Sequence, residues 1–286
     1  MIDIIISLES TCDLDKKQIE ENDLKIIHMN FLVDGEEYNT QKDDVISSGL
    51  YKKMKEGKRT STSLINKSNY IKFFEELLKQ NKPILHLAFS SGLSNTCACA
   101  KDAASELNAK YEKEMIYVVD SLCACSGQGM FAILVKRKAK EVNSIKELID
   151  YAENLKLQVN HDFTVDALKY LANGGRIKPT AAFFGSILNI KPVMKTDDNG
   201  KLIVTGKVLS RKKAINTIFN RIKSTYNHNE DICFISHADC EADAEYLKHL
   251  LITETTLKPI INNLGPIIGS HSGPGTLSVY YLASHR

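Results

Sequence analysis

The sequence has 286 residues, 43% of them hydrophobic and 25% charged, which is enough to bury the core of one large domain or of two ordinary ones. Its 37 basic side chains nearly balance 35 acidic ones, and this net charge of +2 argues against a nucleic-acid partner. No apolar run approaches the roughly 18 residues of a membrane span. The apolar N-terminal run carries Asp3 and Glu9 and lacks a basic segment before it. We therefore expect a cytoplasmic protein without an integral membrane segment.

The first half of the chain alternates predicted strands and helices. The apolar runs that begin at Pro83 and Met115 carry few charges, as strands buried on both faces require. A helical pattern follows each run, which is the order of a parallel sheet covered by helices on both faces. The predicted strands are IDIIIS from Ile2, a strand from Leu24 that leads into a hairpin at Asp34-Gly35, PILHLAF from Pro83 and MIYVVD from Met115. The predicted helices span residues 43–55, 66–79, 94–107, 126–140 and 144–155.

The second half mixes pairs of strands with helices. Two β runs flank Asn199-Gly200, a dipeptide that strongly favours a hairpin turn. A helix over 211–224, a strand from Asp231, a helix over 241–251 and two last strands complete the chain. We therefore predict an α/β fold of two domains. Residues 1–160 form an N-terminal domain with a parallel α/β sheet, and residues 161–286 form a C-terminal α+β domain with antiparallel strands.

Four predicted loops gather small hydroxyl, glycine and cationic side chains. They are RTSTS from Arg59, SSGLSNT from Ser90, NGGRIK from Asn173 and GSHSGPGT from Gly269. Ligands bind beyond the carboxyl ends of the strands in an open α/β sheet. Ser90, Ser91 and the segment DSLCACSGQG from Asp120 therefore become candidates for a binding site, whereas Ser94 has an alternative role as a helix cap.

Nucleotide and metal motifs match poorly. A P-loop is absent, and GQGMFA from Gly127 lies too far from its strand for a dinucleotide fingerprint. The seven cysteines are an odd number that suits free thiols, and their two C-x-C pairs lack zinc-site spacing, so we expect no metal. A serine hydrolase that uses Ser90 or Ser91 with His271 stays an alternative. It has against it the missing G-x-S-x-G motif and the lack of an acid placed behind the histidine.

Seven motifs along the whole chain resemble, in order, those of the DegV family, which includes the fatty-acid-binding subunits of bacterial fatty-acid kinase. ESTCDL resembles D-S-T-x-D-L, RTSTS resembles T-S-x-P-S, and SSGLSNT resembles S-S-x-L-S-G-T. DSLCACSGQG resembles D-S-x-x-x-S-x-G-Q-G, and YLANGGRI resembles L-x-x-G-G-R-I. ILNIKPVM resembles a segment with L-N-I-K-P, and IGSHSGPGT resembles I-G-x-H-x-G-P-G. Each motif is weak alone, but seven in the same order are specific.

The resemblance implies a two-domain α/β protein that holds one long-chain fatty acid in a buried tunnel between the domains. It also implies that the chain is not itself an enzyme and needs no cofactor besides this ligand. A separate ATP-dependent kinase subunit would phosphorylate the presented carboxyl. Position by position, the resemblance implies head-group contacts at Thr60, Ser61, Ser90, Ser91 and His271, support from Ser94, Gly127, Gln128, Gly129 and Gly273, and phosphate or partner contacts at Arg176 and Arg211.

Three residues depart from the family pattern. Ser63 stands where the family has Pro, Asn95 where it has Gly, and Glu9 where it has Asp. None of them removes an implied head-group contact. Burying about fourteen CH2 groups of a ligand is worth roughly 11 kcal/mol before ordering costs. We therefore expect the apolar tunnel to supply the affinity, while the hydroxyls and the imidazole orient the carboxyl.

Overall fold

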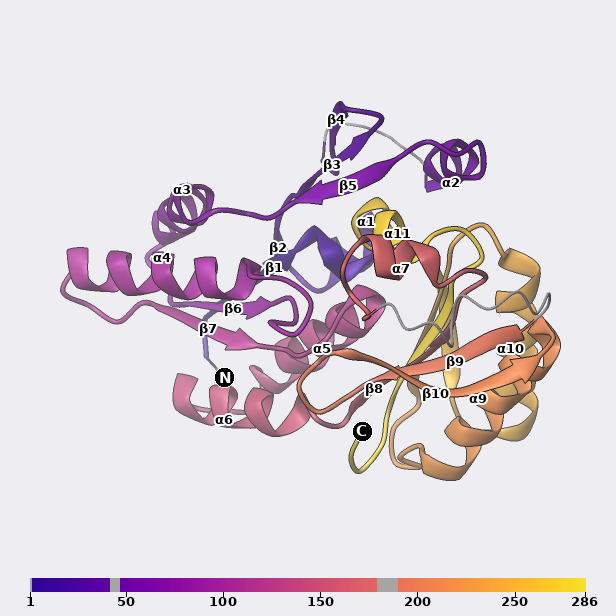
Figure 1. Ribbon diagram of the computed structural model, residues 1–286. Helices are drawn as coiled ribbons and strands as arrows, with labels where there is room; N and C mark the ends of the chain where they lie inside the picture. Colours follow the sequence, from indigo (N-terminus) through magenta and orange to yellow (C-terminus); the bar gives the residue numbers. More distant parts are fainter. Residues whose placement is uncertain (1, 42–46, 179–189) are drawn as a thin grey trace.

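The computed structural model describes residues 2–41, 47–178 and 190–286, and the strands within these residues form three β-sheets (Figure 1). The first sheet has the order β2-β1-β6-β7, and its strands run parallel, as predicted. Every residue of β1 and β6 is buried because helices cover both faces of this sheet (Figure 1). The strands are β1 (Ile5–Glu9), β2 (Leu24–Ile27), β6 (Ile84–Ala88) and β7 (Ile116–Asp120). The covering helices are α3 (Lys67–Leu78) and α4 (Thr96–Lys110) on one face, and α5 (Cys125–Lys138) and α6 (Ile145–Leu155) on the other.

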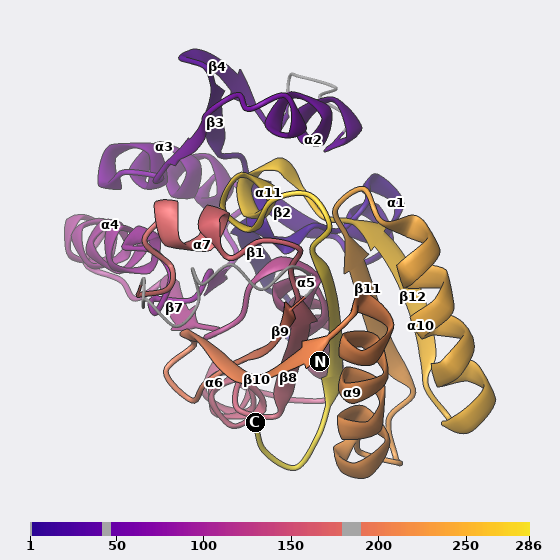
Figure 2. The same ribbon diagram turned by 45° about the vertical axis from the view of Figure 1, so that its right-hand side comes forward.

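The second sheet has the order β10-β9-β8-β13-β11-β12, and its neighbouring strands run antiparallel except for β11 and β12. Its strands are β8 (Val159–Thr164), β9 (Ile190–Thr196), β10 (Leu202–Leu209), β11 (Ile232–His237), β12 (Lys258–Asn263) and β13 (Leu277–Leu282). Helices α9 (Arg211–Thr225) and α10 (Glu241–Glu254) pack on one face. The other face packs on α5, which therefore lies between the two larger sheets and is buried from Cys125 to Val135 (Figure 2).

The third sheet is small, antiparallel and ordered β4-β3-β5. It contains β3 (Asn30–Val33), β4 (Glu36–Asn39) and β5 (Thr60–Ser63). Along the chain, α2 (Ser47–Lys55) lies between β4 and β5, and α3 follows β5. The predicted hairpin at Asp34-Gly35 is confirmed, since it joins β3 to β4. The sheet and α2 extend over the short helix α11 (Pro266–Ser272), which they contact (Figures 1 and 2).

Two predicted loops are wrong, and both belong to the site. RTSTS was expected as a loop, but Thr60–Ser63 is strand β5, which pairs with β3. GSHSGPGT was also expected as a loop, but its first four residues are the last part of α11. Gly273 ends this helix with φ +80°, a conformation that favours glycine.

Other differences concern which helices and strands were predicted. The predicted strand from Leu24 is divided between β2 and β3 in separate sheets, and the short helix α1 (Lys16–Glu21) and strand β8 were not predicted. Part of the predicted helix over 43–55 and the first three residues of ILNIKPVM lie outside the described residues. The two-domain α/β fold is confirmed, whereas the boundary at residue 160 stays a prediction. Within the described residues, no helix has the length and hydrophobicity needed to cross a membrane.

Candidate functional site

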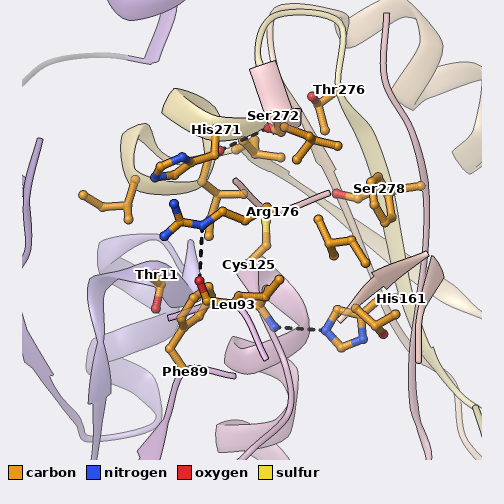
Figure 3. Close-up of a pocket in the computed structure, with 18 of the residues that line it drawn as sticks. Thr11, Phe89, Leu93, Cys125, His161, Arg176, His271, Ser272, Thr276 and Ser278 are labelled. Carbon is orange, nitrogen blue, oxygen red and sulfur yellow. Dashed lines mark hydrogen bonds between the residues drawn. The ribbon is translucent and has the colours of Figure 1, made fainter. Parts of the chain in front are cut away.

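A narrow cavity lies between the two larger sheets and is bounded on one side by α11 and the short helix α7 (Lys169–Asn173) (Figure 3). The space between its wall atoms amounts to about 770 Å³, a value that includes open solvent at its mouth. Most of its wall is apolar and comes from both halves of the chain. Representative wall residues are Phe89, Leu93, Phe163, Leu171, Leu202 and Ile267. The cavity therefore suits an apolar ligand.

His271 lies on α11 at one end of the cavity (Figure 3). Its Nε2 is 2.7 Å from Oγ1 of Thr62 on β5, so the two side chains share a hydrogen bond. Its Nδ1 lies against the backbone of Gly174, where a Cβ would come within 2.4 Å of that nitrogen. Burial, helped by the nearby charge of Arg176, lowers the pKa of His271 to about 4. The imidazole is therefore neutral at pH 7 and acts as a hydrogen-bonding group.

Arg176 brings a positive charge to the same end of the cavity. Its Nε donates to the Leu93 carbonyl at 3.2 Å, and its Nη1 donates to the Gly174 carbonyl just beyond the end of α7. Burial lowers its pKa, yet a guanidinium stays charged in proteins. Among the described residues no carboxylate pairs with it, and it is the only lysine or arginine that lines the cavity. An unpaired, half-buried cation favours an anionic ligand.

A more polar cleft adjoins the cavity on the outside. Thr62, Arg176 and His271 line both spaces, so they form the boundary between them. The outer cleft is also lined by cations and hydroxyls from α2, β5 and α7 or their flanking segments. These include Lys58, Arg59, Thr60, Ser61 and Lys169. A ligand with its tail in the cavity and its acid group at the boundary would be reachable from this basic cleft.

The threonine-serine segment contributes differently from the expectation. Because side chains alternate along a strand, Thr60 and Thr62 point to one side of β5 and Ser61 to the other. Thr60 lines the outer cleft and donates to the Ser270 carbonyl at 2.9 Å, while Ser61 is exposed. Thr62, which is absent from the predicted head-group contacts, is the hydroxyl of this segment that lines the cavity. Thr62 lies two residues after Thr60, and residues at that spacing share one face of a strand. Predicting β5 as a strand would therefore have indicated Thr62 together with Thr60.

The structure does not place Ser90 and Ser91 in the cavity. Ser90 follows β6, as expected, but its Oγ donates to the Gly200 carbonyl at 2.9 Å and accepts from the Gly92 N–H. This hydrogen bond to Gly200 connects the turn between β9 and β10 to the segment that follows β6. Ser91 is exposed, and its N–H donates to Asp120. The hydrolase alternative needs one of these serines beside His271, and the hydroxyl found there is that of Thr62.

Ser94 lines the cavity, one turn after Ser90. It is not the N-cap of α4, which is Asn95, but its Oγ accepts the Thr96 N–H at 3.2 Å. Arg211 lies outside the cavity-lining set, and its Nε donates to Asp243 at 2.8 Å in an ion pair of the second domain. The phosphate or partner contact expected for Arg211 stays a prediction.

The first turn of α5 supports the cavity wall through close packing. Gly127 faces His161, whose Nε2 would lie 2.4 Å from a Cβ at this position, and Gly129 leaves room for Leu14. The side-chain Oε1 of Gln128 accepts a hydrogen bond from the Thr11 hydroxyl at 2.7 Å, and Thr11 lines the cavity. Gly273 approaches the ring of Tyr170, which a Cβ would meet at 2.2 Å. Packing therefore requires Gly127 and Gly129, and Gly273 is required both by packing and by its positive φ.

A buried carboxylate, Glu9, connects these wall elements at the end of β1. It accepts hydrogen bonds from Tyr70 Oη at 2.6 Å, from the Phe89 N–H at 2.9 Å and from Gln128 Nε2 at 2.7 Å. His86 Nε2 lies 3.2 Å from it. Burial alone would raise the pKa of Glu9, but His86 and the other partners hold it below its ordinary value.

Metal ligation has no candidate cluster in the described residues, where no three histidine, cysteine or acidic side chains gather. All seven cysteines lie within these residues and are free, as predicted. Cys125 lines the cavity, and its thiol donates to Asp13 at 2.8 Å. Burial raises the pKa of the Cys125 thiol further, so this thiol is protonated and unreactive at pH 7.

Comparison with known proteins decides the family. The sequence profile of the DegV family, described as uncharacterised proteins, matches residues 2–284. The chain belongs to the DegV family. A DegV domain-containing protein of Clostridium perfringens is 38% identical over 285 residues, covering 99% of this chain and 98% of its own. One of Streptococcus pyogenes serotype M3 is 34% identical and covers 98% of both chains.

Solved structures of DegV proteins have the same fold. A DegV family protein of Thermus thermophilus, described by its fatty acid binding, superimposes with a TM-score of 0.89 at 25% identity, covering 99% of this chain and 100% of its own. DegV of Bacillus subtilis, described as a fatty acid binding protein, has a TM-score of 0.83 at 25% identity with the same coverage. The similarity therefore extends over nearly the whole fold.

Proposed function

We propose that this DegV protein binds one long-chain fatty acid in the cavity and presents its carboxyl to a separate ATP-dependent kinase subunit. The observation that carries the proposal is the charge of Arg176, which pairs with no carboxylate among the described residues and lies at the boundary between an apolar cavity and an open basic cleft. The fatty-acid binding described for the Thermus thermophilus and Bacillus subtilis proteins supports the same ligand class.

The boundary residues have complementary roles in this proposal. Arg176 neutralises the carboxylate, and the guanidinium fork also matches the oxygens of an acyl-phosphate product. Thr62 and neutral His271 orient the carboxylate by hydrogen bonds, since burial lowers the pKa of His271 to about 4. The acyl chain supplies the affinity, because burying about fourteen CH2 groups is worth roughly 11 kcal/mol before ordering costs.

The proposed role is presentation rather than catalysis. The sequence contains no P-loop, and the Cys125 thiol on the cavity wall is kept protonated by burial rather than activated. The kinase would approach through the outer cleft, whose Lys58, Arg59 and Lys169 suit a phosphate-bearing partner site. The chain itself then needs no cofactor besides the fatty acid.

Native mass spectrometry of protein purified from cells tests the binding step. We expect an adduct of fatty-acid mass at one per chain, and uptake of added palmitate or oleate after delipidation. Hexadecanol, which has the same chain without the carboxylate, serves as the comparison ligand and should bind more weakly. A protein that is free of lipid and takes up neither acid contradicts the proposal.

The kinase step is tested separately with the variant His271→Ala. ATP-dependent acyl-phosphate formation in an extract of the source cells, trapped with hydroxylamine, should fall at least roughly tenfold, because an orienting group at the reacting carboxyl is lost. Palmitate affinity should change much less. His249→Ala, on the exposed face of α10, is the matched control and should behave as the wild type. Equal losses of binding and acyl-phosphate formation would show that His271 only holds the ligand.

A further inference from the structure

One hydroxyl in the cavity has no hydrogen-bond partner among the residues that the structure describes. Thr196, the last residue of β9, lines the cavity and is only 2% exposed, and its Oγ1 is buried without a bond. In the described part of the chain, the other buried side-chain atoms in this condition are Thr164 Oγ1 and Arg211 Nη1, and neither residue lines the cavity. Buried hydroxyls are normally bonded, so Thr196 needs an explanation.

The other hydroxyls around the cavity show how unusual this is. Among the described residues, six other serine and threonine side chains line it, and each has a partner. Thr11 bonds Gln128, Thr62 bonds His271, Ser94 bonds Thr96, and the hydroxyls of Ser272, Thr276 and Ser278 bond main-chain carbonyls. The fold therefore satisfies its own hydroxyls here and leaves one unoccupied donor and acceptor on the wall.

Strand geometry turns Thr196 toward the cavity. Side chains two residues apart share a face of a strand, so Thr196 lies on the same face of β9 as Met194. Met194 packs with Phe163 and Leu171, which both line the cavity. Thr164 follows Phe163 on β8 and therefore points to the opposite face of the sheet.

The neighbouring histidine cannot serve as the partner. The register that pairs Asp162 with Lys195 brings Thr196 next to His161 on β8. His161 Nε2 accepts the Ala124 N–H at 3.1 Å, so its Nδ1 carries the proton and donates to the Val159 carbonyl. Burial lowers the pKa of His161 well below its ordinary value, which leaves no second proton to donate. Figure 3 shows His161 on the opposite side of the cavity from His271.

We propose that the cavity selects fatty acids whose chain carries an oxygen substituent, a hydroxyl or an oxo group, at a carbon remote from the carboxyl, and that Thr196 hydrogen-bonds this substituent. The inference rests on the proposed function, because a carboxyl held at Arg176 places the acyl chain in the cavity that Thr196 also lines. A plain alkyl chain would seal the Thr196 hydroxyl, or displace a water from it, without supplying a bond. A substituted chain satisfies the threonine and its own polar group together. Sites with a dedicated hydrogen-bonding group discriminate strongly against ligands that lack its partner.

A competition experiment with the variant Thr196→Val tests this selection. The probes are stearate and hydroxystearates substituted at carbon 9, 10 or 12. The delipidated protein is incubated with stearate and one hydroxystearate together, and native mass spectrometry measures the ratio of the two bound acids. The wild type should prefer the best-placed hydroxystearate over stearate by about tenfold or more. Thr196→Val keeps the side-chain shape without the hydroxyl, and should prefer stearate.

The matched control is Thr164→Val, the same change at a buried, unpartnered threonine outside the cavity. It should keep the wild-type preference, which separates a ligand contact from a general effect on the sheet. Wild type and Thr196→Val with the same ratio of the two acids, or a wild type that prefers stearate over every hydroxystearate, would overturn the inference while leaving fatty-acid binding standing. If neither kind of acid binds the wild type, the proposed function fails and the inference falls with it.

Discussion

Arg176→Gln should weaken palmitate binding by about 10- to 100-fold, because hydrogen bonds to charged groups contribute about 1.5–3 kcal/mol and each 1.4 kcal/mol is tenfold in affinity. Glutamine can still donate a hydrogen bond from this position but carries no charge. The carboxylate would then rely on Thr62 and on a histidine that is neutral, since burial lowers the pKa of His271 to about 4. Displacement of a fluorescent fatty acid by palmitate measures the change.

The comparison with hexadecanol makes the result specific to charge. Wild-type protein should prefer palmitate, and Arg176→Gln should lose most of that preference while its affinity for the alcohol stays nearly unchanged. Arg59→Gln is the matched control, because Arg59 lines the outer cleft but not the cavity. We expect it to bind palmitate as the wild type does. A wild-type palmitate affinity in Arg176→Gln would show that the carboxylate lies elsewhere.

The strands of the first sheet could be predicted because burial leaves a direct mark on their composition. β6 and β7 are apolar at nearly every position, and the helices after them follow the order of a parallel α/β unit. β5 carries no such mark, because Thr60–Ser63 contains only small polar residues. It is a strand because it pairs with β3. Such a contact between distant segments cannot be predicted from the four residues of β5 alone. α11 was missed for a related reason, since its glycine and serines suggested a turn.

The site was predictable as a set of segments and less so as a set of side chains. His271 and Arg176 were both selected from their sequence motifs, and both line the cavity. The direction of a side chain depends on the element that carries it, and this is why Thr62 was missed. Ser90 was assigned to the carboxyl by resemblance, but its hydroxyl is used to hold the Gly200 carbonyl. Thr196 could not be selected at all, since an unpaired hydroxyl is recognised only when all its neighbours are known.

Glu9 is fully buried, and its bonds link α3 to two segments that shape the cavity wall. Phe89 lines the cavity directly, Gln128 holds the Thr11 hydroxyl on the cavity wall, and Tyr70 anchors α3. Removing one side of such a network leaves several buried donors without an acceptor, which is more costly than the net value of the bonds themselves. Glu9 therefore couples the stability of the first domain to the shape of the cavity.

Glu9→Ala should lower the free energy of unfolding by about 3–5 kcal/mol, because several buried donors lose their acceptor and each unsatisfied group costs about 1–3 kcal/mol. Because the chain contains no tryptophan, urea unfolding followed by circular dichroism is the suitable measurement. Glu76→Ala, on the exposed face of α3, is the control and should change stability by less than about 1 kcal/mol.

Since the pKa of Glu9 lies below its ordinary value of 4.5, the carboxylate stabilises the fold above that pH, and this contribution is lost as the pH falls through the folded-state pKa. Glu9→Gln cannot titrate, so its stability should fall less steeply than that of the wild type below pH 4.5; parallel acid limbs in the two proteins would contradict the assignment of a charged Glu9 to the centre of this network.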